Sequence, residues 1–280
     1  MTMLTRTFCH IPGVSTAMEK QLWLQGIHSW DAFHAQTRPV FSLTRNHAAL
    51  LSLDESEKCL LQPDPGYFSK LLPARLHWRL FPSFRDGTAY LDIETSGLSR
   101  HRDIITTVAL YDGKEVRYYI HGQNLADFRE DVAKYQVLVT YNGKAFDIPF
   151  LEHYLDMSLP QSHIDLMHVL RSLGFKGGLK GCEKQLGLVR EGLDGVDGSF
   201  AVRLWRDYAV NGNTKALETL LAYNMADAVN LETLMVEAYN LKLKETPFFD
   251  SLRLDLPKRP QLSFSPDCAT IERLKNCSYP

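Results

Sequence analysis

Cysteine is scarce in this sequence, and its spacing is uninformative. The chain has 280 residues and five cysteines, an odd number in which no two are spaced as Cys-x-x-Cys. This usage argues against both a disulfide framework and a cysteine-based zinc site. A reducing compartment fits best, so we expect a cytoplasmic protein whose free cysteines are Cys9, Cys59, Cys182, Cys268 and Cys277.

Long apolar segments are also missing. The N-terminal segment Met-Thr-Met-Leu-Thr-Arg-Thr-Phe-Cys-His lacks the apolar core of a signal peptide. No stretch reaches the length of about 20 apolar residues that a membrane span requires. The sequence therefore predicts a protein without membrane contact.

A global excess of positive charge is absent as well. Lys and Arg number 31 against 33 Asp and Glu, which gives a net charge of -2. This balance excludes a protein that coats nucleic acid through an overall basic field, so any such contact must be local. Hydrophobic residues make up 45% of the chain, enough for one full core and a smaller appended module.

The chain divides into three zones of different texture: 1–80, 81–245 and 246–280. We expect a small helical N-terminal region in the first zone and a domain that carries the chemistry in the second. Prolines interrupt the third zone and leave little helical periodicity, so it should be a C-terminal extension that wraps over the surface or is partly mobile.

The central zone predicts an α/β fold. Segments rich in β-branched and aromatic residues indicate strands at 89–94, 104–110, 116–120 and 137–141. The spacing of apolar residues indicates helices at 125–133, 148–155, 166–173 and, most clearly, 216–239. Three successive strands followed by alternating helix and strand favour a mixed sheet flanked by helices.

Four carboxylates lie in three motifs of this zone. Asp92 and Glu94 belong to Tyr-Leu-Asp-Ile-Glu-Thr, Asp147 ends Tyr-Asn-Gly-Lys-Ala-Phe-Asp, and Asp227 ends Tyr-Asn-Met-Ala-Asp. Residues two apart on a strand point to the same side, so Asp92 and Glu94 can share one ion. We expect Asp147 to cap the helix that follows it. Tyr223 and Asp227 are four apart on a predicted helix and hence share one face.

Clustered carboxylates of this kind predict a site for two metal ions. Hard oxygen ligands favour Mg²⁺ or Mn²⁺. Two such ions about 4 Å apart can stabilise both the attacking and the leaving oxygen of a phosphodiester. The alternative is that the carboxylates cap helices or lie on solvated faces. A single Asp-x-Glu is common by chance, whereas three ordered motifs in a strand and helix context are not.

These motifs resemble the DEDD superfamily of 3′→5′ exonucleases, which has an RNase H-like fold, and more narrowly the YprB-like RNase H-like domain. That superfamily carries either a His five residues before the last Asp or a Tyr four before it. Here Ala222 and Tyr223 stand at these positions, which resembles the tyrosine subclass. The resemblance implies that Tyr223 orients the attacking water and that two ions are held by Asp92, Glu94, Asp147 and Asp227.

Tyr223 and four neighbours of the carboxylates are the remaining site candidates. A phenol with an ordinary pKa of about 10 is a weak base at neutral pH, so Tyr223 should mainly position the water. It could instead be ordinary core. Contacts to a terminal nucleotide are expected from Thr95 through its N–H or hydroxyl, from Asn142 and Phe146 at the sugar or base, and from Lys144 at a phosphate.

Several other polar residues have a structural interpretation. Asp165 precedes an apolar run and is expected to cap the helix there or to support the site, while His168 should pack or lie on the surface. Lys176-Gly-Gly-Leu-Lys180-Gly lacks the P-loop pattern, and we expect a turn leading into a helix that contains Leu-Gly-Leu at 186–188. A phosphate contact from Lys176 or Lys180 is the alternative. Arg203, Trp205 and Arg206 could contact a nucleic-acid backbone, or they could simply lie on the surface of a helix; the sequence favours neither alternative.

The N-terminal zone contains Ile-Pro-Gly-Val-Ser at 11–15, followed by two apolar segments. This resembles a helix-hairpin-helix element, in which a Gly-containing hairpin offers backbone N–H groups to a phosphate. The alternative is that two short helices simply pack on the central domain. Their apolar residues are Leu22, Trp23, Ile27, Trp30 and Phe33.

We therefore expect a two-metal-ion 3′→5′ exonuclease that releases nucleoside 5′-monophosphates from single-stranded ends, with DNA more probable than RNA as substrate. The alternatives are an RNase H-like endonuclease, an RNA exonuclease, and a non-catalytic module that binds nucleic acid. Four intact acidic positions argue against the last of these, because a scaffold has no need to keep like charges together.

Overall fold

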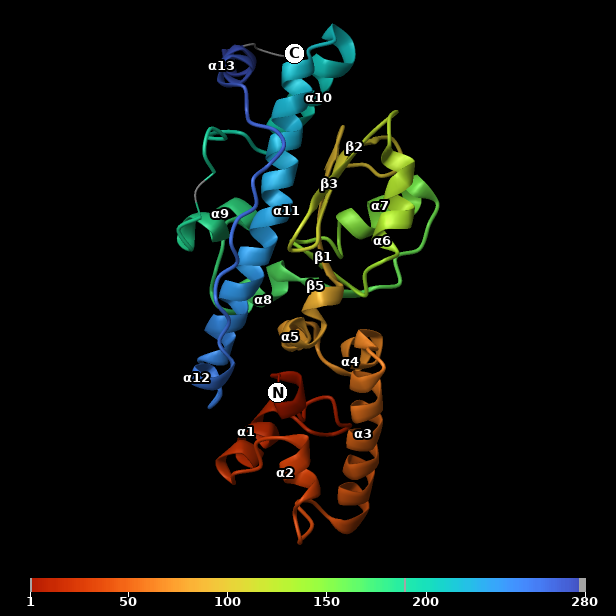
Figure 1. Cartoon of the computed structure of the whole chain (residues 1–280), viewed down its shortest axis with the longest axis vertical. Helices are drawn as coiled ribbons and strands as arrows, with labels where there is room; N and C mark the ends of the chain where they lie inside the picture. Colours follow the sequence, from red (N-terminus) through yellow and green to blue (C-terminus); the bar gives the residue numbers. More distant parts are fainter. Residues whose placement is uncertain (1, 189, 277–280) are drawn as a thin grey trace.

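The computed structural model describes residues 2–188 and 190–276 (Figure 1). A five-stranded sheet with the order β3-β2-β1-β4-β5 lies at its centre. Strands β1 to β3 form an antiparallel meander, and β4 and β5 add to β1 in parallel. The strands are β1 Thr88–Thr95, β2 Ile105–Tyr111, β3 Val116–Ile120, β4 Val137–Thr140 and β5 Ser162–Asp165. The expected α/β fold with a mixed sheet is confirmed.

Strand β5 is the element of the sheet that the sequence did not predict. Its four residues, Ser-His-Ile-Asp, are short and half polar, so neither a strand alternation nor an apolar run stands out. Pairing with β4 defines it, because Val137 to Thr140 run beside Ser162 to Asp165 in parallel register.

Helices cover both faces of the sheet. Side chains of one face, with Leu91 and Ile93, pack with the helices α6 Phe128–Val132 and α7 Asp147–Leu155. Those of the other face, with Tyr90, pack on α8 Leu166–Ser172 and on the long helix α11 Thr214–Leu243. In Figure 1, α11 runs along one side of the sheet, with α6 and α7 on the other. Each predicted helix is present, although 125–133 splits into a 3-10 turn and α6.

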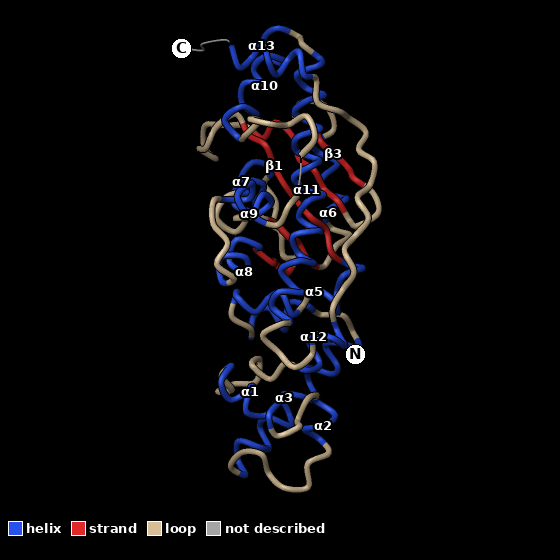
Figure 2. Tube along the Cα trace, turned by 90° about the vertical axis from the view of Figure 1, so that its left-hand side faces the viewer, coloured by secondary structure: helices blue, strands red, loops and turns tan. Residues whose placement is uncertain are grey.

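The molecule is elongated. Figures 1 and 2 show the N-terminal helices at one end and α10 with α13 at the other. The remaining helices are α1 Thr16–Leu24, α2 Trp30–His34, α3 Leu43–Leu61, α4 Pro65–Leu71, α5 Phe81–Phe84, α9 Gly178–Gln185, α10 Gly198–Asn211, α12 Phe249–Leu252 and α13 Cys268–Asn276. None of the helices in the described ranges is both long and apolar enough to span a membrane.

Aromatic packing organises the N-terminal helices. Trp30 stacks on Phe68 with ring centroids 6.2 Å apart, and Trp23 meets Phe248 edge-on at 5.2 Å. The apolar residues named for this region are all buried, namely Leu22, Trp23, Ile27, Trp30 and Phe33. The ring partners Phe68 and Phe248 belong to the N-terminal region and the C-terminal extension, and not to the central domain. A phosphate contact at the Gly13 turn, and the division of the chain at 80 and 245, stay predictions.

A buried ion pair ties α1 to the 3-10 helix before α5. The Arg79 guanidinium donates to both carboxylate oxygens of Glu19 at 2.8 Å. Glu19 also accepts the N–H groups of Phe8 and Cys9 at 2.6 and 3.1 Å. A buried carboxylate requires such partners, because its desolvation would otherwise cost several kcal/mol.

The C-terminal extension follows α11 back along its length, as the dark blue trace in Figure 1 shows. Asn240 bonds both backbone groups of Leu254, at 2.8 and 2.9 Å. The extension wraps over the surface as expected, but it also contains α13, so the expectation of little helix there was wrong. Ile271 and Leu274 of α13 are buried against α10 and α11, and this tertiary contact stabilises a helix too short to show a clear apolar period.

Candidate metal centre

The sheet and α11 bring three of the four carboxylates together. Asp92 and Glu94 of β1 and Asp227 of α11 each place one carboxylate oxygen within 4.8 Å of the others. Strand alternation explains the first pair. Asp92 and Glu94 share the side of β1 that carries Tyr90, and this side faces α11. Residues of β1 and α11 that are far apart in the sequence therefore meet at one point.

The cluster lies at a cleft of about 570 Å³. Asp147 lines the same cleft but stands outside the group of three within the described part of the chain. We had expected Asp147 to cap α7, and this expectation was wrong. Phe146 occupies the N-cap position and Asp147 is the first helical residue, with its side chain directed to β1, where Oδ1 accepts the N–H of Ile93 at 3.3 Å.

The carboxylates strongly disfavour one another's charge. Burial raises the pKa of Asp92 well above its ordinary value, and the charges of Asp227 and Glu94 raise it further. Burial raises the pKa of Asp147 to about 7. Burial also raises the pKa of Asp227, to about 6, although the charge of Arg190 opposes the rise. Oxygen donors that are buried together and repel one another fit a hard divalent cation, which would relieve this repulsion.

Side-chain donors bind one oxygen of Asp92 and one oxygen of Asp227. The Asn224 amide donates to Oδ2 of Asp92 at 2.6 Å. Nη1 of Arg190 donates to Oδ1 of Asp227. Neither Asn224 nor Arg190 was among the residues expected at the site from the sequence. Asn224 stands within the Tyr-Asn-Met-Ala-Asp motif and could have been found there, whereas Arg190 lies in a loop without any periodic signal.

Tyr223 lines the cleft beside Asp227 and is buried. Burial, and next the charge of Asp227, raise the pKa of its phenol far above the ordinary value. Nζ of Lys180 lies 4.4 Å from the centroid of its ring, within the range of a cation–π contact. The hydroxyl is therefore protonated at neutral pH and can donate a hydrogen bond into the cleft.

Three of the four predicted nucleotide contacts line the cleft: Thr95, Asn142 and Phe146. The Thr95 hydroxyl already donates to Gly97 O at 2.6 Å, which leaves it an acceptor. Lys144 is exposed and does not occur among the described lining residues. Its backbone N–H instead donates to Oδ2 of Asp165 at 3.2 Å.

Asp165 supports the loop that carries these residues. Oδ1 accepts the N–H of Asn142 at 2.8 Å and that of Met167 at 3.0 Å. The bond to Met167 caps α8, so the predicted N-cap is confirmed. The bond to Asn142 holds a residue whose φ of 63° lies in the left-handed region. His168 is exposed, in agreement with a surface histidine.

The segment after α8 differs in part from its prediction. Helix α9 ends at Gln185 and does not contain 186–188, because Gly187 has a φ of 74°, which ends the helix. Lys180 of α9 lies against the Tyr223 ring. On α10, Trp205 is buried against α11, so it is not a surface residue of this helix.

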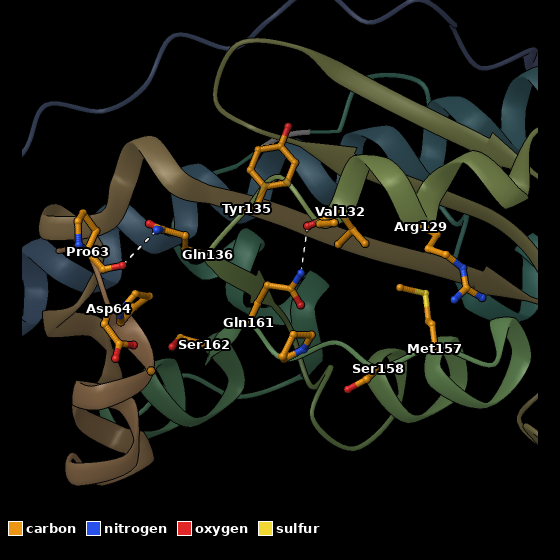
Figure 3. Close-up of a pocket in the computed structure, with 14 residues that line it drawn as sticks. Pro63, Asp64, Arg129, Val132, Tyr135, Gln136, Met157, Ser158, Gln161 and Ser162 are labelled. Atoms are coloured by element: carbon orange, nitrogen blue, oxygen red, sulfur yellow. Dashed lines mark hydrogen bonds between the residues drawn. The ribbon is translucent and has the colours of Figure 1, made fainter. Parts of the chain in front are cut away.

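A second cavity, of about 510 Å³, lies at the opposite end of the parallel strands (Figure 3). Gln136 immediately precedes β4 and Ser162 begins β5, so both stand at the N-terminal ends of their strands. Gln136 donates to Pro63 O at 3.1 Å and Gln161 to Val132 O at 3.0 Å. None of the clustered carboxylates lines this cavity, and ligands of such sheets bind at the other end.

Comparison with known proteins identifies the family of the central domain. A model of the RNase H superfamily matches residues 89–239. A family B DNA polymerase from the archaeon Pyrobaculum calidifontis aligns with 17% identity over 56% of this chain, with a TM-score of 0.43; the alignment spans only 24% of the polymerase. A structure described as the apo form of a nuclease aligns with 21% identity over 59% of this chain and 90% of its own, with a TM-score of 0.32. No curated protein matches. Because the family model covers more than half of the sequence, the chain belongs to the RNase H superfamily.

Proposed function

We propose that the protein is a metal-dependent 3′→5′ exonuclease that hydrolyses nucleic acid, with single-stranded DNA ends as the preferred substrate. Membership of the RNase H superfamily supports hydrolysis of nucleic acid. The observation that carries the proposal is the convergence of Asp92, Glu94 and Asp227 within 4.8 Å on a cleft that Asp147 and Tyr223 also line.

The donor set suits two Mg²⁺ or Mn²⁺ ions, held by Asp92, Glu94, Asp147 and Asp227. When bound, such ions supply Lewis-acid activation of water and stabilise the charge on the leaving oxygen. The protein's own residues then have separate tasks. The Tyr223 hydroxyl would orient the water toward the phosphorus, and its position four residues before Asp227 supports the tyrosine subclass of the DEDD superfamily and a YprB-like domain.

The lining of the cleft supports a role in holding the last nucleotide. Phe146 offers an aromatic face on which a base can stack. Asn142 offers an amide for the sugar or base edge, and its backbone is fixed by Asp165. Stacking on one strand suits an unpaired 3′ end, in which the terminal base is free to leave its neighbours. Lys144, exposed beside Asn142, would meet a phosphate further along the strand.

The test is degradation of 5′-labelled linear single-stranded DNA and RNA, with Mg²⁺, Mn²⁺ or EDTA, beside matched circles. Wild type is compared with Asp92→Asn and with Asp255→Asn, which removes an exposed aspartate of the C-terminal extension. We expect a metal-dependent ladder that shortens from the 3′ end, no cleavage of circles, loss of activity in Asp92→Asn, and normal activity in Asp255→Asn.

Three other results would contradict the proposal in different ways. Cleavage of circles would show an endonuclease, and a ladder on RNA alone would show an RNA exonuclease. No cleavage with any metal, together with no ion binding by calorimetry, would leave a module that only binds nucleic acid.

A further inference from the structure

Arg190 connects the acidic cluster to a second buried carboxylate. It lies on the loop between α9 and α10 and lines a cavity together with Lys180 and Glu183. Its Nη1 donates to Oδ1 of Asp227, and its Nε donates to Oε2 of Glu183 at 2.7 Å. One guanidinium therefore spans a cluster residue on α11 and an acid on α9.

Glu183 is in turn bonded to a residue of α11. Glu183 is only 2% exposed, and its Oε1 accepts Nδ2 of Asn230 at 2.8 Å. Asn230 lies three residues after Asp227, hence one helical turn away. Asp227, Arg190, Glu183 and Asn230 thus form a chain of three hydrogen bonds that begins and ends on α11, in which the planar fork of Arg190 sets the distance between two carboxylates.

The charges along this chain favour a geometric role over neutralisation of the cluster, because two carboxylates share the one guanidinium of Arg190. Nη1 of Arg190 donates to Oδ1 of Asp227 and so restricts the orientation of a carboxylate that lies beside Asp92 and Glu94. The Arg190 guanidinium carbon also lies 5.6 Å from the Tyr223 ring centroid, so one side chain contacts both functional residues of the last motif.

We infer that Arg190 is a positioning residue, which uses Glu183 as its anchor to hold Asp227 in the orientation that binds a divalent ion. The inference rests on the proposed function only in assigning an ion to the cluster. A loss of either end of the fork lets Asp227 rotate. Changes of this kind beside a metal ligand lower metal affinity by about 10–100-fold.

The experiment is calorimetric titration of the metal-free protein with Mn²⁺, with thermal unfolding as the control for folding. Arg190→Lys keeps the charge but lacks the planar fork that bonds both carboxylates. The double variant Arg190→Met/Glu183→Met removes Arg190 together with its anchor, so that Glu183 is not left buried without its counter-charge. Lys184→Met, on the exposed side of α9 beside the same cavity, is the matched control.

We expect both Arg190 variants to bind Mn²⁺ at least about tenfold more weakly than wild type, and Lys184→Met to bind normally. Wild-type affinity in Arg190→Lys would show that only the charge matters and would overturn the inference. Equal or tighter binding in the double variant would overturn it as well, because Arg190 would then merely compete with the ion. Failure of the wild type to bind Mn²⁺ would instead overturn the proposed function, and this inference with it.

Discussion

The side-chain amide of Asn224 donates to Oδ2 of Asp92 at 2.6 Å and to the main-chain carbonyl of the same residue at 3.1 Å. Asn224 is fully buried on α11, and Asp92 lies on β1. The pair therefore attaches the long helix to the central strand at a candidate ligand. It sets the orientation of Asp92 in the way that Arg190 sets that of Asp227.

Asn224→Ala should reduce both stability and cleavage. Loss of a buried bond to a charged group costs about 1.5–3 kcal/mol in the free energy of unfolding. Asp92 would also lose its orientation, so the cleavage rate should fall at least tenfold, by about the loss seen when partners of metal ligands are removed. Urea unfolding and the DNA ladder measure the two effects. Asn240→Ala, which removes the Leu254 bonds further along α11, should lower stability but leave the rate unchanged; a normal rate in Asn224→Ala would contradict this role.

Asp165→Ala should loosen the loop that carries Asn142. Three backbone N–H groups lose their acceptor, those of Asn142, Lys144 and Met167. Loss of the α8 cap alone costs about 1 kcal/mol. We expect a raised KM for single-stranded DNA with a smaller change in kcat, because the affected groups face the terminal nucleotide. Asp165→Asn keeps one acceptor oxygen, so its KM should lie between those of wild type and Asp165→Ala. An unchanged KM in Asp165→Ala would show that this loop does not take part in substrate binding.

Arg79→Met should strongly destabilise the N-terminal helices. It leaves the carboxylate of Glu19 buried without its counter-charge, and breaking a buried pair in this way costs about 3–5 kcal/mol. Chemical denaturation measures the loss. The exposed pair of Lys58 with Glu55 is the comparison, and Lys58→Met should change the unfolding free energy by less than about 1 kcal/mol. Equal effects of the two substitutions would refute the buried-pair argument.

Two histidines that are buried in the neutral form should contribute less to stability as the pH drops below about 6.5. The raised pKa values of Asp147 and Asp227 act in the opposite direction, so the histidine contribution is measured by comparison with a variant. Burial lowers the pKa of His10 from 6.5 to about 3, and that of His163 likewise. Between these values the unfolded chain binds protons that the native state excludes, so acid favours unfolding. Each histidine contributes a slope of up to about 1.4 kcal/mol per pH unit, and the stabilisation is complete above pH 6.5.

His10→Leu isolates one of these contributions. His10 packs against Trp30 and Phe68, with ring centroids at 5.4 and 6.0 Å, so leucine can replace part of the contact. The unfolding free energy of wild type relative to that of His10→Leu should become smaller from pH 7.5 to 6 and 5. A constant difference between the two proteins would show that His10 does not titrate on unfolding in this range.

Much of the site could be predicted from local patterns. Alternation on β1 placed Asp92 and Glu94 on one side, and the helical repeat placed Tyr223 and Asp227 on one face, because both relations depend only on the geometry of a single element. The three strands of the meander and strand β4 were predictable from their β-branched and aromatic residues. Asp147 shows the limit, since sequence spacing suggested a helix cap, whereas the neighbouring strand offered its side chain the N–H of Ile93.

The sequence alone determined the sheet's antiparallel half, the long helix and the order of the acidic motifs, since each of these is encoded by residues close together in the chain. Only the tertiary structure decided the pairing that creates β5, the packing that stabilises α13, and the partners of the acidic residues. Arg190 reaches Asp227 across 37 positions, and Asn224 reaches Asp92 across 132. No local period records such contacts, because they form only when burial of the sheet and α11 brings distant polar groups together and makes each of them require a partner.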